Sequence, residues 1–169
     1  MSFKDRPIFV EHKVSGIGAI PIIKAKCPNV FMCLARSTNG NIVTYEFTSS
    51  NNIDVYWLLA EPSHGQAWRK QHGHDREELS VLERLQAYGV TVTNGKTSNQ
   101  KHIVINSLTR KSVLVTRTKS GKAVAITKIN GIQCIVDYIW VEAGGIGAKW
   151  VELHGKDPKT KQRHSERFK

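Results

Sequence analysis

The chain has 169 residues, of which 40% are hydrophobic and 23% are charged, as in ordinary globular proteins. This length is typical of one domain with a sizeable core, and the composition excludes a low-complexity chain. The charge balance is unusual, because 25 Lys and Arg against 14 Asp and Glu give a net charge of +11. Such an excess favours anionic partners, namely nucleic acid, an acidic membrane surface or an acidic protein.

The cysteines and the first residues indicate a compartment. Cys27, Cys33 and Cys134 are odd in number, show no Cys-x-x-Cys spacing and lie in apolar surroundings, which suits free thiols better than disulfides. The first residues carry charges throughout, unlike a secretion signal, and the apolar run 14–23 is too short and too broken by Gly and Pro to span a bilayer. We therefore expect a soluble protein of the cytoplasm or another reducing intracellular compartment, without a transmembrane segment.

The first third of the chain is predicted to form an extended arm and three strands. Prolines and glycines interrupt residues 1–28, which predicts an extended arm with a short strand around Ala19–Ile23. The apolar run 29–36 predicts a buried strand, and the alternation of 41–47 predicts a half-buried one. The β-branched and aromatic residues of 53–60 predict a third strand.

One amphipathic helix is predicted over residues 76–88. Asp75 is a good N-cap residue, and Glu78 completes an Asp-x-x-Glu capping pattern. Leu79, Leu82, Leu85 and Tyr88 recur on one face, which predicts packing against an apolar surface. Gly89 follows at the position where a left-handed C-terminal cap is common.

The rest of the chain alternates in the manner of short strands separated by turns. Asn-Gly, the strongest short hairpin signal, occurs at 39–40, 94–95 and 130–131. Residues 156–169 are polar, with six basic and two acidic side chains, and are predicted to form a basic C-terminal tail. The remaining strands are predicted at 90–92, 102–108, 112–118, 123–129, 132–142 and 149–155.

These elements predict a mainly β fold, in which a single antiparallel β-rich domain of about eight or nine strands (residues 29–155) packs against one helix near 76–88. A barrel-like meander and a two-sheet sandwich both fit this pattern. The N-terminal arm (1–28) and the basic tail (156–169) would flank the domain.

Five phrases carry a family resemblance, namely LARSTNGNIVTYEF, VYWLLAE, LERLQAYGVTV, AVAITKINGIQCIVDYIWV and VELHGKDPKTK. By their order and spacing the chain resembles an uncharacterised family catalogued as domain of unknown function 4833. The resemblance runs from about Val30 to Glu166 and implies a single domain. It implies no activity, cofactor or site residue.

Clustered basic residues predict a surface for an anionic macromolecule. On antiparallel strands, Lys and Arg at alternate positions can follow a phosphate backbone. Tyr45, Tyr56, Trp57, Tyr138 and Trp140 could stack on bases, but their apolar neighbours favour places in the core. The candidate anion-binding residues are Arg110, Lys111, Arg117, Lys119, Lys122, Lys128, Lys156, Lys159, Lys161, Arg163, Arg167 and Lys169.

A pocket for a small ligand is the alternative. An arginine at the rim of a β-domain can pair with a carboxylate or phosphate group of a ligand. Arg36 and Arg84 can equally pair with carboxylates of their own domain, such as Glu46 or Glu83, and we favour that interpretation. The candidate rim residues are Arg36, Tyr45, Tyr56, Trp57, Arg84 and Tyr88.

Metal and catalytic signatures are weak. His64, His72 and His74 could together hold a zinc ion, but this polar stretch precedes the predicted helix, and no Cys-x-x-Cys or HExxH motif supports it. The sequence shows no Gly-x-Ser-x-Gly elbow and no phosphate-binding loop. We therefore predict a non-enzymatic basic interaction module without a cofactor, which docks on RNA or a ribonucleoprotein, or on an acidic protein. An enzyme whose site assembles from distant residues is the third interpretation.

Overall fold

The fold is taken from a computed structural model. It describes residues 9–14, 18–23, 27–38, 40–59, 70–72, 76–144 and 147–169, with backbone pairing alone before residue 27. The elements are β1 (Phe9–Val14), β2 (Gly18–Ile23), β3 (Val30–Arg36), β4 (Ile42–Phe47), β5 (Ile53–Leu58), β6 (Arg76–Glu78), α2 (Val81–Gln86), β7 (Val90–Asn94), β8 (Lys101–Ile105), β9 (Leu108–Arg117), β10 (Ala123–Ile129), β11 (Ile132–Ala143), β12 (Ala148–Lys156) and β13 (Arg163–Phe168).

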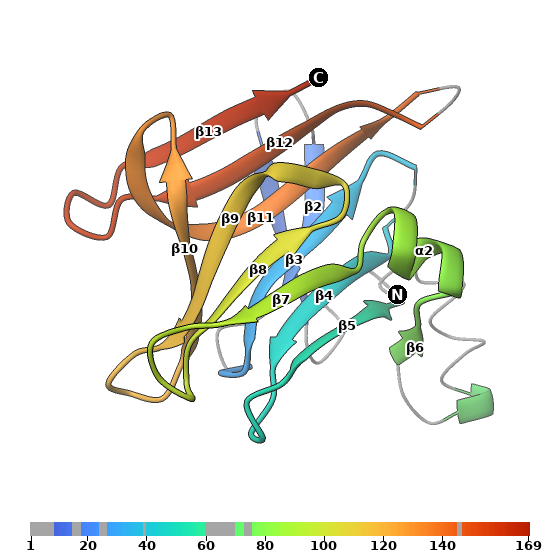
Figure 1. Cartoon of the computed structure of the whole chain (residues 1–169). Coiled ribbons are helices and arrows are strands. Elements are labelled where there is room, and N and C mark those ends of the chain that lie inside the picture. The colour runs from blue at the N-terminus through green and yellow to red at the C-terminus, as the bar shows by residue number, and fades with distance from the viewer. Residues whose placement is uncertain are drawn as a thin grey trace.

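Eleven of these strands form one sheet in the order β6-β5-β4-β3-β11-β10-β9-β8-β7, with β12 on β11 and β13 on β12. The sheet curls into a half-barrel (Figure 1), so the mainly β prediction is confirmed in its barrel-like form. The described strands number thirteen, because β1, β6 and β13 were not predicted. All pairs are antiparallel except β3 with β11, where Cys33 lies opposite Tyr138.

The core lies inside the curl of the sheet. The fully buried side chains there include Leu34, Tyr45, Phe47, Ile103 and Val115. They come from both arms of the half-barrel, namely the strands β3 to β6 on one side and β7 to β10 on the other. Burying a side chain of this size stabilises a fold by roughly 1.5–3 kcal/mol. The sheet is therefore held mainly by side chains that meet across its concave face.

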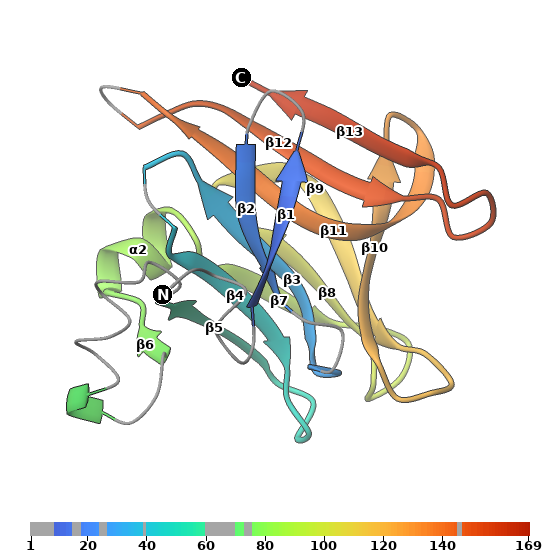
Figure 2. The same ribbon diagram turned by 180° about the vertical axis from the view of Figure 1, so that it is seen from behind.

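The outer face is also buried over β3 and β4. The half-buried pattern predicted for 41–47 is wrong, because only Glu46 of β4 is not fully buried. The reason is the hairpin of β1 and β2, which crosses the back of the sheet (Figure 2), with β2 against β3. The strand predicted around Ala19–Ile23 is β2, and β1 is its unpredicted partner. Alternation of polar and apolar residues in a strand indicates that one face of the sheet is covered. It cannot show whether a second layer covers the other face.

The helix predicted over 76–88 is wrong in its first half. Residues 76–78 form β6, with Glu78 opposite Tyr56 and Arg76 opposite Leu58. The Arg76 guanidinium lies 3.7 Å from the centre of the Tyr56 ring and pairs with Asp54, and these contacts hold the segment extended. Asp75, the predicted N-cap, lies outside the described residues.

The helix α2 begins instead after Ser80. The Ser80 hydroxyl accepts from the Glu83 N–H at 3.2 Å, and the Glu83 carboxylate accepts from the Ser80 N–H at 2.8 Å, which is a complete capping box. The predicted packing of Leu82 and Leu85 is wrong, because these side chains are 65% and 67% exposed. Gly89 does not adopt a left-handed conformation, and the C-cap residue is Ala87.

The structure confirms the turn at Asn130-Gly131, confirms the hairpin at 94–95 but with a longer loop, and moves the turn predicted between 108 and 112. Asn130 and Gly131 have φ of 50° and 80° in a two-residue hairpin turn, as predicted. Asn94 instead belongs to β7, and the Gly95 N–H bonds the Gln100 carbonyl at the neck of a longer loop. The predicted link between 108 and 112 is part of β9, and the turn lies at 106–107. Asn39 lies outside the described residues.

Half of the segment predicted as a tail belongs to the sheet. Residues 163–168 form β13, which pairs with β12, and Phe168 packs against the core. The Glu166 carboxylate accepts from the Asn130 N–H at 2.8 Å, which fixes β13 to the turn between β10 and β11. No helix in the described ranges is long and apolar enough to cross a membrane.

Candidate anion-binding surface

One arm of the half-barrel carries positive charge without any acidic residue. Residues 84–136 contain no Asp or Glu and nine Lys or Arg. This segment forms strands β7 to β10 and the start of β11. Carboxylates that could neutralise these cations must therefore come from other parts of the chain, and the structure shows which cations find one.

Arg117 is bound inside the protein. Its guanidinium donates to the Asn29 side-chain oxygen and to the Phe47 and Thr48 carbonyls, each at 2.9 Å, and lies 4.7 Å from the centre of the Phe47 ring. Phe47 is the last residue of β4, on the other arm of the sheet, and Thr48 follows it. Arg117 therefore joins the two arms and is not available to an external anion.

Lys111 is also occupied. Its amine donates to the Lys128 carbonyl at 2.6 Å and lies 3.1 Å from Glu166, with its side chain 17% exposed. The hydrogen bond from the Asn130 N–H, followed by the contact with Lys111, outweighs partial burial and lowers the pKa of Glu166. This ion pair holds β13 against β9 and β10.

Two arginines of β13 pair with acids of neighbouring strands. Arg163 donates to Asp137 at 2.8 Å. Arg167 donates to Glu152 at 2.9 Å and lies 3.7 Å from the centre of the Trp150 ring. Both are exposed and attach the edge strand to the sheet.

The other eight predicted cations have no ion pair within the described part of the chain. All are exposed except Lys156, which is partly exposed. They lie on β9 and β10, in the turn between those strands, at the end of β12, in the loop to β13 and, for one of them, directly after β13. They are Arg110, Lys119, Lys122, Lys128, Lys156, Lys159, Lys161 and Lys169.

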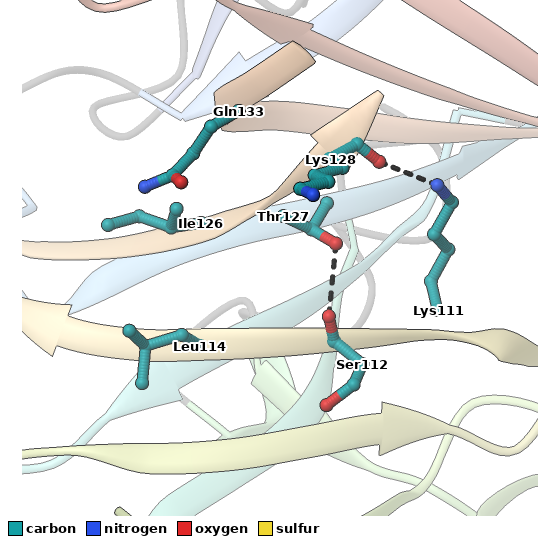
Figure 3. A pocket seen from close by; sticks show the side chains of 7 residues that line it. All are labelled: Lys111, Ser112, Leu114, Ile126, Thr127, Lys128 and Gln133. Atoms are coloured by element: carbon teal, nitrogen blue, oxygen red, sulfur yellow. Dashed lines mark hydrogen bonds between the residues drawn. The ribbon is translucent and has the colours of Figure 1, made fainter. Parts of the chain in front are cut away.

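A shallow groove of about 360 Å³ lies among these cations on the outer face of β9, β10 and β11. Its apolar floor comes from Leu114 and Ile126, which are opposite one another in the β9–β10 pair. Polar side chains surround the floor (Figure 3), with Lys128 opposite Gln133. The lining residues are Lys111, Ser112, Leu114, Ile126, Thr127, Lys128 and Gln133.

Strand register places Lys156 on the same face as the groove. Ile126 is opposite Ile135, and Ile135 is opposite Lys156. Residues directly opposite in neighbouring strands project to the same side of a sheet. Lys156 therefore lies two strand spacings from Ile126, about 10 Å away.

The alternative site around Arg36 is assembled at the seam between the sheet and α2. The Arg36 guanidinium lies 4.5 Å from the centre of the Trp57 ring and donates to the Tyr88 hydroxyl at 3.3 Å. The Trp57 indole donates to Glu83 at 3.2 Å, and Tyr45 donates to the Tyr88 carbonyl at 2.9 Å. Arg36 therefore faces aromatic rings and a carboxylate of its own domain.

Two predicted rim residues lie elsewhere. Tyr56 projects from the other face of β5 and donates to Glu46 at 3.0 Å. Arg84 pairs at 3.4 Å with Glu78, and both side chains are largely exposed. The Arg36 cluster is thus smaller than predicted and bridges α2 to β3, β4 and β5.

The sequence matches the family described as Domain of unknown function (DUF4833) over residues 32–167. The chain belongs to the DUF4833 family. The match runs from β3 into β13, so it covers nearly all of the main sheet and leaves the β1–β2 hairpin outside. Neither the curated proteins nor the solved structures contain a match to this DUF4833 chain.

The predicted zinc ligands do not form a described site in this DUF4833 protein. His72 is exposed, and His64 and His74 lie outside the described residues. No group of three or more His, Cys, Asp or Glu in the described ranges is placed to hold a metal ion. All three cysteines are free, and Cys33 and Cys134 are buried.

Sequence reasoning missed the uncharged part of the groove. Ser112, Leu114, Ile126 and Gln133 have ordinary strand residue types, and no motif distinguishes them. The only signal available was the alternation that turns them outward within residues 84–136, a segment without acidic residues. The five aromatic residues considered for base stacking are all buried, with exposed fractions of 7% or less.

Proposed function

We propose that this DUF4833 protein is a non-enzymatic interaction module that docks on a polyanion, RNA or a ribonucleoprotein assembly, through the outer face of β9 and β10 and the adjoining turns. The observation that carries the proposal is the set of eight predicted cations that have no carboxylate partner within the described residues. Binding of phosphates by such cations releases condensed counterions, which is the main driving force of non-specific nucleic-acid binding.

The distribution of acids supports the same proposal. Acidic side chains placed among the basic ones would repel the phosphates that the basic ones attract. Residues 84–136 contain no Asp or Glu. The free thiols of the three cysteines fit a reducing intracellular compartment, which we include in the proposal.

The small-ligand alternative has weaker support. The Arg36 guanidinium already lies on the Trp57 ring, bonds Tyr88, and helps to lower the pKa of Glu83. A ligand carboxylate at this place would compete with these contacts. A small anion that raises the melting temperature of the protein, but not that of an Arg36→Met variant, would favour this alternative.

The experiment that tests the proposed function is the salt dependence of binding to a labelled single-stranded RNA. Each phosphate contact contributes about −0.7 to the slope of log affinity against log salt for single strands. The double variant Lys128→Ala with Lys156→Ala should therefore flatten the slope by about 1.4, since it removes two contacts. Lys70, an exposed lysine that belongs to none of these strands, provides the single-charge control Lys70→Ala, which should leave the slope unchanged.

Two results would count against the proposed function. One is no measurable salt-dependent binding to RNA. The other is a decrease of the slope in Lys70→Ala that is half the decrease in the double variant. Each removed charge would then have the same effect wherever it lies, so the attraction would come from net charge alone.

A further inference from the structure

We infer that the groove on β9, β10 and β11 receives a nucleobase, so that the module binds single strands in preference to duplexes. The inference rests on the proposed function, because the surrounding cations hold the backbone of the same strand. A groove floor of aliphatic side chains with polar groups at its margin matches a base, which has apolar faces and polar edges.

The floor consists of Leu114 and Ile126, which are both partly exposed on the outer face of the sheet. Elsewhere on the sheet the large aliphatic side chains are mostly buried, as Val113 and Val115 are on the opposite face of β9. The two floor residues are opposite one another across β9 and β10 and give a flat apolar surface between two strands. Such a surface can lie against the face of one base.

The margin offers hydrogen-bonding groups that the protein does not use. The side chains of Gln133 and Ser112 have no hydrogen bond within the described residues, and Figure 3 shows both beside the floor. An amide donates and accepts at once, and a hydroxyl does the same, so each can bond a polar edge of a base. By contrast, Thr127 already donates to the Ser112 carbonyl and Lys111 to the Lys128 carbonyl.

Cations lie on two sides of the groove. Lys128 belongs to its margin, and Lys156 follows on the same face about 10 Å from Ile126. Arg110 precedes the groove on β9 and is exposed. A strand of a few nucleotides can thus place phosphates on these cations while one base lies on the floor. A duplex keeps its bases stacked and paired, so only its phosphates can engage.

The test compares three labelled probes of equal length by fluorescence anisotropy at one salt concentration: a single-stranded RNA, the same strand with abasic sites throughout, and the RNA duplex. We expect the single strand to bind about fivefold tighter than the abasic strand, which corresponds to about 1 kcal/mol of apolar contact between a base and the aliphatic floor. Gln133→Ala and Ile126→Ala should each bring that ratio towards one and leave the affinity for the abasic strand unchanged. Lys119→Ala, which removes a cation outside the groove, should weaken both strands equally.

The outcomes separate the inference from the proposed function. Equal affinities of the wild-type protein for the RNA and the abasic strand overturn the base site and leave polyanion docking intact. Tighter binding of the duplex than of the single strand also overturns it. Absence of measurable binding to all three probes overturns the proposed function itself. Gln133 is exposed, so Gln133→Ala keeps the test valid even if Ile126→Ala lowers stability.

Discussion

The glycine after α2 gives the sharpest stability prediction. A Cβ atom added at Gly89 would lie 1.9 Å from the Arg84 carbonyl oxygen and 2.8 Å from the Arg84 carbonyl carbon. Both are backbone atoms, so rotation of a side chain cannot relieve the overlap, and the last turn of α2 must move. That turn is fixed by the Asn106 amide, which donates to the Arg84 carbonyl at 2.9 Å and to the Leu85 carbonyl at 3.2 Å.

The size of the effect of Gly89→Ala follows from these contacts. Overpacking costs roughly 1–3 kcal/mol, and each neutral hydrogen bond that is lost costs about 1 kcal/mol. We expect a loss of about 3 kcal/mol in the free energy of unfolding, which for a chain of this length lowers Tm by about 6–12 °C.

Thermal unfolding followed by circular dichroism measures this change. Asn106→Ala is the matched control, because it removes the two amide hydrogen bonds without any overlap and should cost about 2 kcal/mol. A Gly89→Ala protein that melts within about 2 °C of the wild type would refute the reasoning, since Gly89 could not then lie so close to the last turn of α2.

Three further predictions concern other parts of the protein. Burial raises the pKa of Glu83, but the hydrogen bonds from the Ser80 N–H and the Trp57 indole and the charge of Arg36 outweigh burial, so the pKa of Glu83 lies below its ordinary value of 4.5. The contribution of the Glu83 carboxylate to stability should therefore be present above pH 4.5 and disappear on acidification. The stability deficit of Glu83→Gln, measured by urea unfolding, should shrink over the same pH range, and a deficit independent of pH would argue against this reasoning. Deletion of 163–169 should lower Tm by several degrees, because it removes β13 and its core contact, and an unchanged Tm would mean that β13 is dispensable. Burial raises the pKa of the Cys33 thiol to about 12, and Cys134 is fully buried. A thiol reagent at pH 8 should therefore label one cysteine, Cys27, in the native protein and all three cysteines after unfolding. Labelling of Cys33 at the rate of Cys27 would contradict this burial.

Local patterns predicted those elements that depend on neighbouring residues. The buried run of β3, the extended conformation of β4 and the turn at Asn130-Gly131 each follow from the intrinsic preferences of a few adjacent residues. The choice of helix start was different, because the sequence offers two overlapping capping signals, Asp75 with Glu78 and Ser80 with Glu83. Pairing of β6 with β5, a contact between distant segments, decides in favour of the second.

The sequence predicted where the basic residues of the candidate surface cluster, but it could not predict which of them are free to bind an anion. Clusters of Lys and Arg are visible in the sequence, but the acids and carbonyls that occupy Arg117 and Arg163 come from residues far away in the chain. The strand β13 was hidden because its partly buried positions, His164, Glu166 and Phe168, include a single apolar side chain, in a segment rich in Lys and Arg. Edge strands often carry such charges, which makes them resemble tails.

The parallel contact between β3 and β11 has a consequence for how the chain folds. Cys33 and Tyr138 are opposite in that pair, although about a hundred positions separate them in the chain. The antiparallel groups β3–β5 and β7–β10 can each form from nearby residues, but they join only when β11 pairs with β3. Closing so long a loop slows folding, and until then the edge of β3 is an open template for pairing with other chains. During synthesis most of the chain must leave the ribosome before this edge can be covered.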